Sequence, residues 1–263
     1  MPTRTSAPIG APCWTDLMTS NADAARAFYG EIFGWVAEEP NPEFGGYFNF
    51  RRNDVRVAGC MTSEPGAEFS NSWSTYLSTD DISKTLEAVS SHGGQIFAPA
   101  SAVGDLGIMA ITADPGGAMV GIWQPGQHKG FGVIAEHGAP GWFELHTRDY
   151  RAVVDYYRDV FRWDTEAVGD SDEFRYTVQK VGDEQCAGIM DSASFLPEGV
   201  PARWEVYFAV DDTDATLAQV AALGGTVTEP AVDTPYGRLA AANDPNGARF
   251  KLVGPNDQMP AGN

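Results

Sequence analysis

The chain contains two copies of one pattern, and this repeat limits the folds that it can adopt. The first copy reads APCWTDLMTSNADAARAFYGEIFGW at residues 11–35, and the second reads APGWFELHTRDYRAVVDYYRDVFRW at residues 139–163. The matching aromatic residues lie 128 positions apart throughout this stretch. A repeat of that length is far longer than a solenoid unit and has the size of a whole domain. The sequence therefore predicts two related domains fused in tandem.

Further matches at nearly the same offset extend this prediction along most of the chain. We place the first domain at residues 1–124, the second at residues 140–263, and a linker, in which the periodicity lapses, at residues 125–139. Because 43% of the 263 residues are hydrophobic, each half of the chain can bury a core of its own.

The formal net charge of −19 restricts the partners that we expect for the chain. Nucleic acids and anionic membranes attract clustered Lys and Arg, so we expect neither as a partner. The three cysteines are odd in number and lack Cys-x-x-Cys spacing, which predicts reduced thiols in a cytoplasmic protein. No apolar run has the length of a signal peptide core or a membrane span, so we expect neither.

Each copy opens with the pattern of a strand followed by the pattern of a helix. Residues 14–19 alternate between two faces, as a half-buried strand does. Ser20 is the expected N-cap of a helix that runs to about Phe33, and Asp149 is the expected N-cap in the second copy.

A second strand and helix follow within each copy. The helices expected at 80–94 and 211–225 begin at paired aspartates, which are favourable at the positive helix end, and stop at Gly-Gly, which supplies a left-handed cap. DPGG at 114–117 and DPNG at 244–247 predict tight turns between later strands. We therefore expect two β-α-β-β-β units in each domain, four in the chain, and an α+β fold class.

These motifs resemble those of the vicinal oxygen chelate superfamily, which includes glyoxalases, bleomycin resistance proteins and dioxygenases. More narrowly, the chain is similar to the two-domain actinobacterial members of that superfamily. The resemblance rests on AFYGEIFGW at 27–35, VDYYRDVFRW at 154–163, the Asp-Asp helix starts and the DPGGA and DPNGA turns, and it covers almost the whole chain. It implies that the four units form two open barrels, each with a small-molecule cavity.

The resemblance also implies where a metal ion would be held. Family enzymes use a His on the first strand, a His or Glu before the second helix, and a Glu after the DPxG turn. In this chain a tryptophan, a serine and a glycine stand at these positions in the first domain, and only one carboxylate remains in the second. Because indole, glycine and a lysine ammonium offer no suitable lone pair, we expect no metal and no other cofactor there. The corresponding positions are Trp14, Ser74, Gly121, Trp142, Glu205 and Lys251.

Strand alternation predicts which side chains face the first barrel. If Leu17 packs under the helix, the neighbouring side chains on its strand point inward. The result is an aromatic lining with few polar groups, which suits an apolar or planar small molecule, although the same aromatics could simply fill a barrel core. The ligand-binding residues expected here are Trp14, Asp16, Met18, Ser74, Tyr76 and Trp123.

The second barrel is expected to be more polar. Glu144 and His146 are two positions apart on one strand, so they share a face and could act as a general acid and base. Glu205 and Tyr207 complete the set of candidate catalytic residues. The expected ligand-binding residues in this barrel are Trp142, Arg249 and Lys251.

Two other interpretations of the same polar residues stay open. In one, Arg249 and Lys251 neutralise the two glutamates in a buried ion network that has only a structural role. In the other, Glu144, His146 and Glu205 hold a divalent metal at a shifted place, which the nearby cations oppose. The histidines at 128 and 137 fall in the linker, where we expect them to be solvated.

Three functions follow from these alternatives. The first is metal-free binding of an apolar or aromatic small molecule, such as a drug, a pigment or a secondary metabolite. The second is a metal-independent isomerase or hydrolase-type enzyme that uses Glu144 and His146, and the third is a metal-dependent glyoxalase-like lyase or dioxygenase. Because tandem fusion could replace the dimer contact common in the family, the resemblance also implies a monomer.

Overall fold

The computed structural model describes residues 5–64 and 71–258. The elements of the first copy are β1 (Pro12–Thr19), α1 (Ala22–Phe33), β2 (Val36–Ala37), the 3₁₀ helix η1 (Pro42–Phe44), β3 (Phe48–Arg52), β4 (Val55–Thr62), β5 (Ser72–Ser78), α2 (Ile82–Ser91), β6 (Gln95–Val103), β7 (Gly107–Ala113) and β8 (Met119–Pro125). Those of the second copy are β9 (Pro140–Thr147), α3 (Tyr150–Phe161), β10 (Asp164–Asp170), β11 (Arg175–Val181), β12 (Glu184–Asp191), β13 (Arg203–Ala209), α4 (Thr213–Ala222), β14 (Thr226–Thr234), β15 (Gly237–Asn243) and β16 (Arg249–Gly254).

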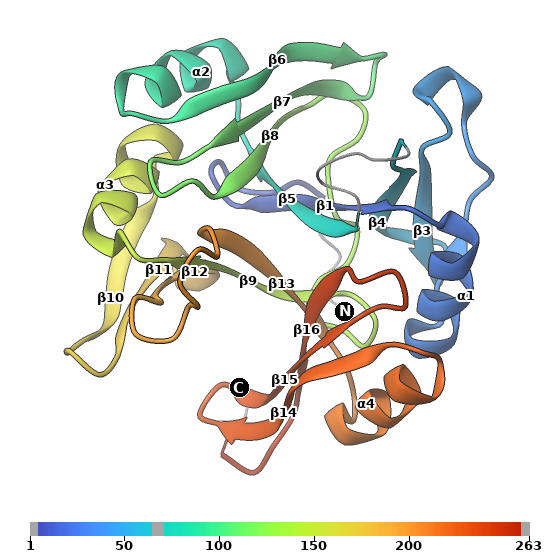
Figure 1. Ribbon diagram of the computed structural model, residues 1–263. Coiled ribbons are helices and arrows are strands. Elements are labelled where there is room, and N and C mark those ends of the chain that lie inside the picture. Colours follow the sequence, from blue (N-terminus) through green and yellow to red (C-terminus); the bar gives the residue numbers. More distant parts are fainter. Residues whose placement is uncertain (1–4, 65–70, 259–263) are drawn as a thin grey trace.

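Each copy forms one eight-stranded sheet (Figure 1). The first sheet has the order β2-β3-β4-β1-β5-β8-β7-β6, and the second repeats it as β10-β11-β12-β9-β13-β16-β15-β14. In the first sheet, β1 pairs antiparallel with β5, while β4 and β8 run parallel to their central neighbours. Two β-α-β-β-β units thus meet edge to edge in each sheet, which confirms the α+β class and the two open barrels.

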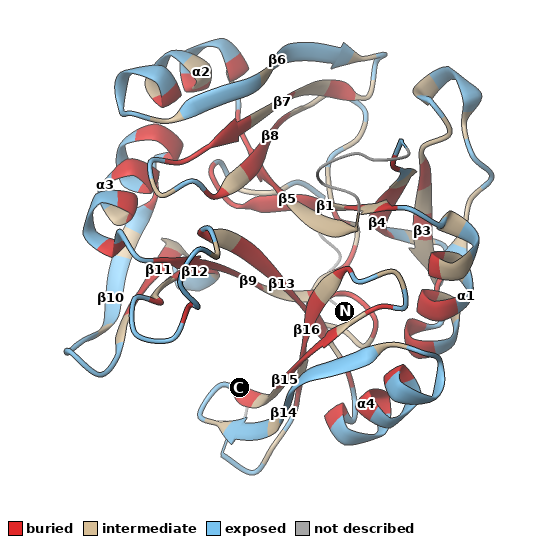
Figure 2. Ribbon diagram, in the orientation of Figure 1, coloured by how far each residue is buried: buried red, intermediate tan, exposed pale blue. Residues whose placement is uncertain are grey.

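The burial of the strands follows their place in the sheet (Figure 2). Central strands such as β1 and β13 are almost wholly buried, whereas the outer strands β6, β10 and β14 are mostly exposed. The candidate site residues all lie on central strands or their direct neighbours. The proposed boundaries at 124 and 140 remain predictions, and residues 1–4 and 259–263 at their outer ends fall outside the described part of the chain.

The helix caps agree with the sequence in three of four cases. Asp81 and Asp212 accept hydrogen bonds from the first turns of α2 and α4, and Asp149 is the N-cap residue of α3. The expectation for Ser20 was wrong, because Asn21 caps α1 by accepting from the amide of residue 24. Ser20 instead binds the side chain of Asn71 through both its amide and its hydroxyl.

The first helix of each copy packs against the other copy, so the two domains share a core. α1 lies beside α4 and α2 beside α3 (Figure 1). The hydroxyl of Tyr29 donates to Asp244 in the second domain at 3.2 Å, and that of Tyr157 donates to Asp114 in the first domain at 3.2 Å. Many residues that match between the copies therefore hold the interface, which explains why the repeat is so visible in the sequence.

Within the described residues, none of the helices combines the length and the apolar character that a membrane crossing requires.

Candidate functional site

The first barrel contains a small cluster of aromatic residues around one carboxylate. On β1, the indole of Trp14 donates to Asp16 Oδ1 at 2.9 Å, and the hydroxyl of Tyr47 donates to the same oxygen at 2.8 Å. The phenol of Tyr76, from β5, also interacts with this carboxylate and helps to lower its pKa. We call Trp14, Asp16, Tyr47 and Tyr76 the first-barrel cluster.

The second barrel repeats this arrangement with a glutamate. The indole of Trp142 donates to the hydroxyl of Tyr176 at 2.9 Å, and that hydroxyl donates to Glu144 Oε2 at 2.9 Å. Tyr207, from β13, donates to Glu144 Oε1 at 2.8 Å. We call Trp142, Glu144, Tyr176 and Tyr207 the second-barrel cluster.

Glycines on neighbouring strands make room for the tyrosines of both clusters. A Cβ on Gly59 would overlap the Tyr47 hydroxyl, and a Cβ on Gly188 would overlap the Tyr176 hydroxyl. These glycines occupy the same position in the AGCM and AGIM motifs. In both barrels, the absence of a side chain on the glycine therefore leaves room for the tyrosine hydroxyl that contacts the acid.

His146 adds a second ionisable group to the second-barrel cluster. Its Nε2 lies 2.6 Å from Glu144 Oε1, and only 4% of the residue is exposed. The residue at the matching position in the first barrel is Met18, which cannot form such a pair. The predicted partnership of Glu144 and His146 on one strand face is thus present in the geometry.

The surroundings of Asp16 and Glu144 stabilise the negative charge of the carboxylate to different extents. Burial raises the pKa of Asp16 above its ordinary value, and the hydrogen bonds it accepts only partly oppose this. Burial would also raise the pKa of Glu144, but the hydrogen bond and charge of His146, followed by the charge of Lys251, lower it to about 2. Glu144 is therefore a stable anion at neutral pH, whereas the Asp16 anion is less favoured.

Glu205 belongs to an ion network rather than to the Glu144 cluster. Its Oε1 accepts hydrogen bonds from Arg203 at 2.7 Å and from Arg249 at 3.0 Å. These positive charges outweigh the effect of burial and lower the pKa of Glu205. The buried network anticipated from the sequence is present here, with Arg203 as an additional member.

Lys251 connects the network to the second-barrel cluster. Its Nζ donates to the Tyr207 hydroxyl at 3.1 Å, and the same hydroxyl donates to Glu144. Tyr207 therefore lies between an ammonium group and a carboxylate. Lys251 is 8% exposed, and its nearest further carboxylate, that of Glu229, is 3.9 Å away.

The linker closes one end of the first barrel. The ring of His128 packs edge-on against the indole of Trp14, with 4.4 Å between the ring centroids. Phe131 stacks on the same indole, with 5.4 Å between the centroids. Trp14 is 4% exposed as a result, whereas Trp142 is only half-buried. The expectation of a solvated His128 was wrong, because burial between aromatic rings lowers its pKa to about 4.

The remaining predicted residues of the first barrel lie around this packed region. Trp123 on β8 donates from its indole to the backbone carbonyl of His128 at 3.0 Å. Ser74 stands opposite Asp16 in the sheet register and is half-buried, as is Met18. The linker residue His128 therefore contacts both Trp14 and Trp123 of the predicted set.

Three further residues, Tyr47, Tyr176 and Arg203, contact the predicted carboxylates. The two tyrosines are 129 positions apart, the offset of the AGCM and AGIM motifs, so the repeat contained a signal for them. Arg203 precedes Glu205 by two positions and shares its strand face, which strand alternation could have revealed.

The side chains at the family's metal positions do not fit a metal ion. Trp14, Ser74 and Gly121 supply no carboxylate, imidazole or thiolate, and in the second barrel the Glu205 carboxylate is engaged by two arginines. Across residues 5–64 and 71–258, no group of three or more His, Cys, Asp or Glu side chains could hold a metal. Glu144, His146 and Glu205 form no such group among these residues.

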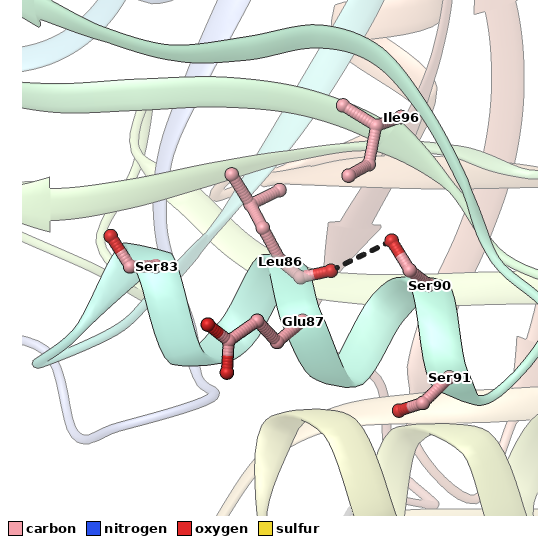
Figure 3. Close-up of a pocket in the computed structure, with 6 residues that line it drawn as sticks. All are labelled: Ser83, Leu86, Glu87, Ser90, Ser91 and Ile96. Carbon is pink, nitrogen blue, oxygen red and sulfur yellow. Dashed lines mark hydrogen bonds between the residues drawn. The ribbon is translucent and has the colours of Figure 1, made fainter.

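Two surface hollows lie outside both barrels. One, of about 580 Å³, runs along α2 and β6 and is lined by Leu86, Ile96 and four polar residues (Figure 3). The other, of about 350 Å³, surrounds the start of α3 next to Arg148 and Arg175. Neither hollow is lined by the residues of the two clusters.

The comparisons with known proteins agree with this architecture. The model of the Glyoxalase/Bleomycin resistance protein/Dioxygenase superfamily matches residues 13–122 and again residues 139–252. The chain therefore belongs to this superfamily and contains two copies of its domain.

Two full-length relatives come from actinobacteria. The chain is 38% identical over 264 residues to "Putative glyoxylase CFP32" of Mycobacterium tuberculosis, covering 98% of this chain and 100% of the relative. It is 34% identical over 269 residues to the anthracycline biosynthesis protein DnrV of Streptomyces peucetius, covering 96% of each chain.

Solved structures share the fold at low sequence identity. The Mn(II)-bound glyoxalase of Novosphingobium aromaticivorans aligns with a TM-score of 0.64 at 14% identity, over 94% of this chain and 82% of that one. The 2,3-dioxygenase LapB of Pseudomonas sp. KL28 aligns with a TM-score of 0.62 at 17% identity, over 95% and 93%. At such identities the likeness establishes the fold alone.

Proposed function

We propose that this protein binds a planar, largely apolar small molecule in its second barrel without a coordinated metal ion. The observation that carries this proposal is the contrast between the two indoles. Trp14 is covered by linker residues, whereas Trp142 is half-buried beside a hydrogen-bonded carboxylate. A partly exposed indole next to a few fixed polar groups is a composition that suits a small-molecule site.

Both the donor set and a relative support the proposal. The residues at the family's metal positions are poor ligands, so an aromatic compound rather than a metal chelate suits the barrel. The relative DnrV is named for anthracycline biosynthesis, and anthracyclines are compounds with a planar anthraquinone core. A ligand of that shape could stack on Trp142.

The binding proposal is tested with a neutral anthraquinone on chelator-treated protein. We expect alizarin dimethyl ether to quench tryptophan fluorescence at one equivalent per chain, and Trp142→Ala to weaken binding about tenfold through loss of stacking. Trp14→Phe should bind like the unaltered protein. Binding that appears only after a divalent metal is added, or no saturable binding at all, would contradict the proposal.

A second candidate function is metal-independent acid-base catalysis. It is favoured by the 2.6 Å contact between His146 and Glu144, because an ionised carboxylate can hold an imidazole in a fixed orientation. In an isomerisation or hydrolysis, His146 would transfer the proton and Glu144 would hold the ring. His146→Ala should then abolish turnover of a bound compound while leaving its affinity within about threefold, and equal turnover would exclude this role.

We further propose that the chain acts as a cytoplasmic monomer. The hydrogen bonds of Tyr29 and Tyr157 join its own two domains, as a dimer contact would join separate chains. No disulfide joins the cysteines of the described segments, which is consistent with a reducing compartment. Sedimentation at micromolar concentration should give the mass of one chain, and a dimer would refute this assignment.

A further inference from the structure

The second barrel contains a buried ammonium group whose hydrogen-bonding capacity is largely unused. Lys251 is 8% exposed and carries three N–H donors. Among the residues that the structure describes, its Nζ donates one hydrogen bond, to the Tyr207 hydroxyl. The half-exposed Glu229 is 3.9 Å away, which is an ion-pair distance rather than a hydrogen bond. A buried charge with spare donors is costly unless another acceptor completes its surroundings.

The two carboxylates of the second barrel nearest to Lys251 in the cluster and the network are already engaged by other donors. Glu144 accepts from two tyrosines and contacts His146, and Glu205 accepts from two arginines. The remaining donors of Lys251 are therefore available to a group from outside the chain. Such a group must be an oxygen acceptor, and a negative charge on it would suit the ammonium best.

The first barrel cannot offer the same feature. Its matching position is Gly121, where a Cβ would overlap the ring of Tyr76. Within residues 5–64 and 71–258, the single acid of the first-barrel cluster also has no lysine or arginine bound to it. A cation at this point of the lining thus distinguishes the second barrel from the first.

We propose that Lys251 binds the ionised oxygen of a hydroxylated planar aromatic ligand, so that the second barrel selects acidic phenols and enols over neutral aromatics. This inference rests on the proposed function, because it names the chemical class of ligand for the same site. The aromatic rings of the ligand stack near Trp142, and its oxygen receives hydrogen bonds from Nζ. The hydroxyl group of the ligand releases its proton to solvent as it ionises, and the resulting anion binds Nζ.

The test compares alizarin, an anthraquinone whose absorption shifts from yellow to red on ionisation, with its dimethyl ether. We expect the protein to bind alizarin at least tenfold more tightly than the ether at pH 7, and to lower the pKa of the bound hydroxyl. Lys251→Met should weaken alizarin binding about tenfold and abolish that pKa change, yet leave the affinity for the ether unaltered. Lys251→Arg should retain most of the preference because it retains the charge.

The controls separate this inference from the proposed function. Lys84→Met removes one positive charge from the exposed face of α2 and should change neither affinity. Binding of the ether by Lys251→Met reports that its barrel is folded. If both compounds bind equally well to the unaltered protein and to Lys251→Met, the role of Lys251 is refuted while small-molecule binding stands. If neither compound binds, the proposed function fails and this inference fails with it.

Discussion

The two barrels have the same scaffold but use their interiors differently. In both, two tyrosines and a tryptophan surround one acid, and a glycine makes room for a phenol. In the first barrel the linker residues His128 and Phe131 cover the indole, and no lysine or arginine of the described segments bonds the acid. In the second, His146 and Lys251 join the cluster. The two copies thus share their packing, whereas the acid of the second copy is joined by an imidazole and an ammonium group.

The largest expected difference between the barrels concerns their tryptophans. Trp14→Ala should cost about 3–5 kcal/mol of unfolding free energy, because it empties a packed site between His128 and Phe131. Trp142→Ala should cost about half as much, since Trp142 is already partly exposed. Urea unfolding of both variants measures this. Equal losses would show that the second barrel is as tightly filled as the first.

The next largest difference concerns the two acids. Glu144→Gln should destabilise the protein by about 3 kcal/mol at pH 7, because the surroundings favour the charged carboxylate. Asp16→Asn should change the free energy of unfolding by less than about 1 kcal/mol, because burial disfavours the Asp16 anion. Both substitutions preserve side-chain volume, so they serve as controls for each other in urea unfolding. A larger loss for Asp16→Asn would reverse the assignment of the charged barrel.

The positions of the helices and of the second-barrel acid and imidazole could be predicted from the sequence. Strand alternation and repeat offsets depend only on local periodicity, so they correctly placed Glu144 and His146 on one face and located all four helices. The cap of α1 was misplaced by one residue because Ser20 and Asn21 are both good capping residues. Ser20 donates two long-range hydrogen bonds to Asn71 Oδ1, which no local pattern contains, and is thereby held outside the cap.

Such local patterns could not predict that linker residues cover Trp14 in the first barrel. The linker has no periodicity, so its contact with Trp14 depends on how the chain folds back over the sheet. The hydrogen bonds of Tyr47 and Tyr176 likewise reach carboxylates that lie 31 and 32 positions earlier in the chain. The repeat offset could have suggested these tyrosines as a pair, but not the carboxylates that they contact.

A carboxylate at the domain interface provides a reference outside both barrels. Burial raises the pKa of Asp114 to about 6, so the folded state holds this proton more tightly than the unfolded state does. Its contribution to stability is therefore complete below about pH 4 and is lost as the pH rises through 6, by about 2–3 kcal/mol at most. Glu144 acts with the opposite sign, since its contribution is lost as the pH falls through about 2.

Urea unfolding between pH 4 and 7 measures the interface effect. The unaltered protein should lose stability across this range, and Asp114→Asn should flatten the profile, because asparagine keeps the shape without the titration. Glu144→Gln should leave the slope in this range unchanged. An unchanged slope in Asp114→Asn would mean that another group titrates in this window.

The smallest expected difference concerns the tyrosines that connect each indole to its acid. Trp14 Nε1 reaches Asp16 directly as well as Tyr47, so Tyr47→Phe leaves that indole with a partner. The described partner of Trp142 Nε1 is Tyr176, so Tyr176→Phe releases the indole that the ligand is proposed to contact. We expect each variant to lose about 1 kcal/mol of stability. Only Tyr176→Phe should weaken binding of alizarin dimethyl ether, by about threefold, in a fluorescence titration. A similar effect of Tyr47→Phe on binding would show that the first barrel also receives ligand, and the division of roles between the two barrels would have to be abandoned.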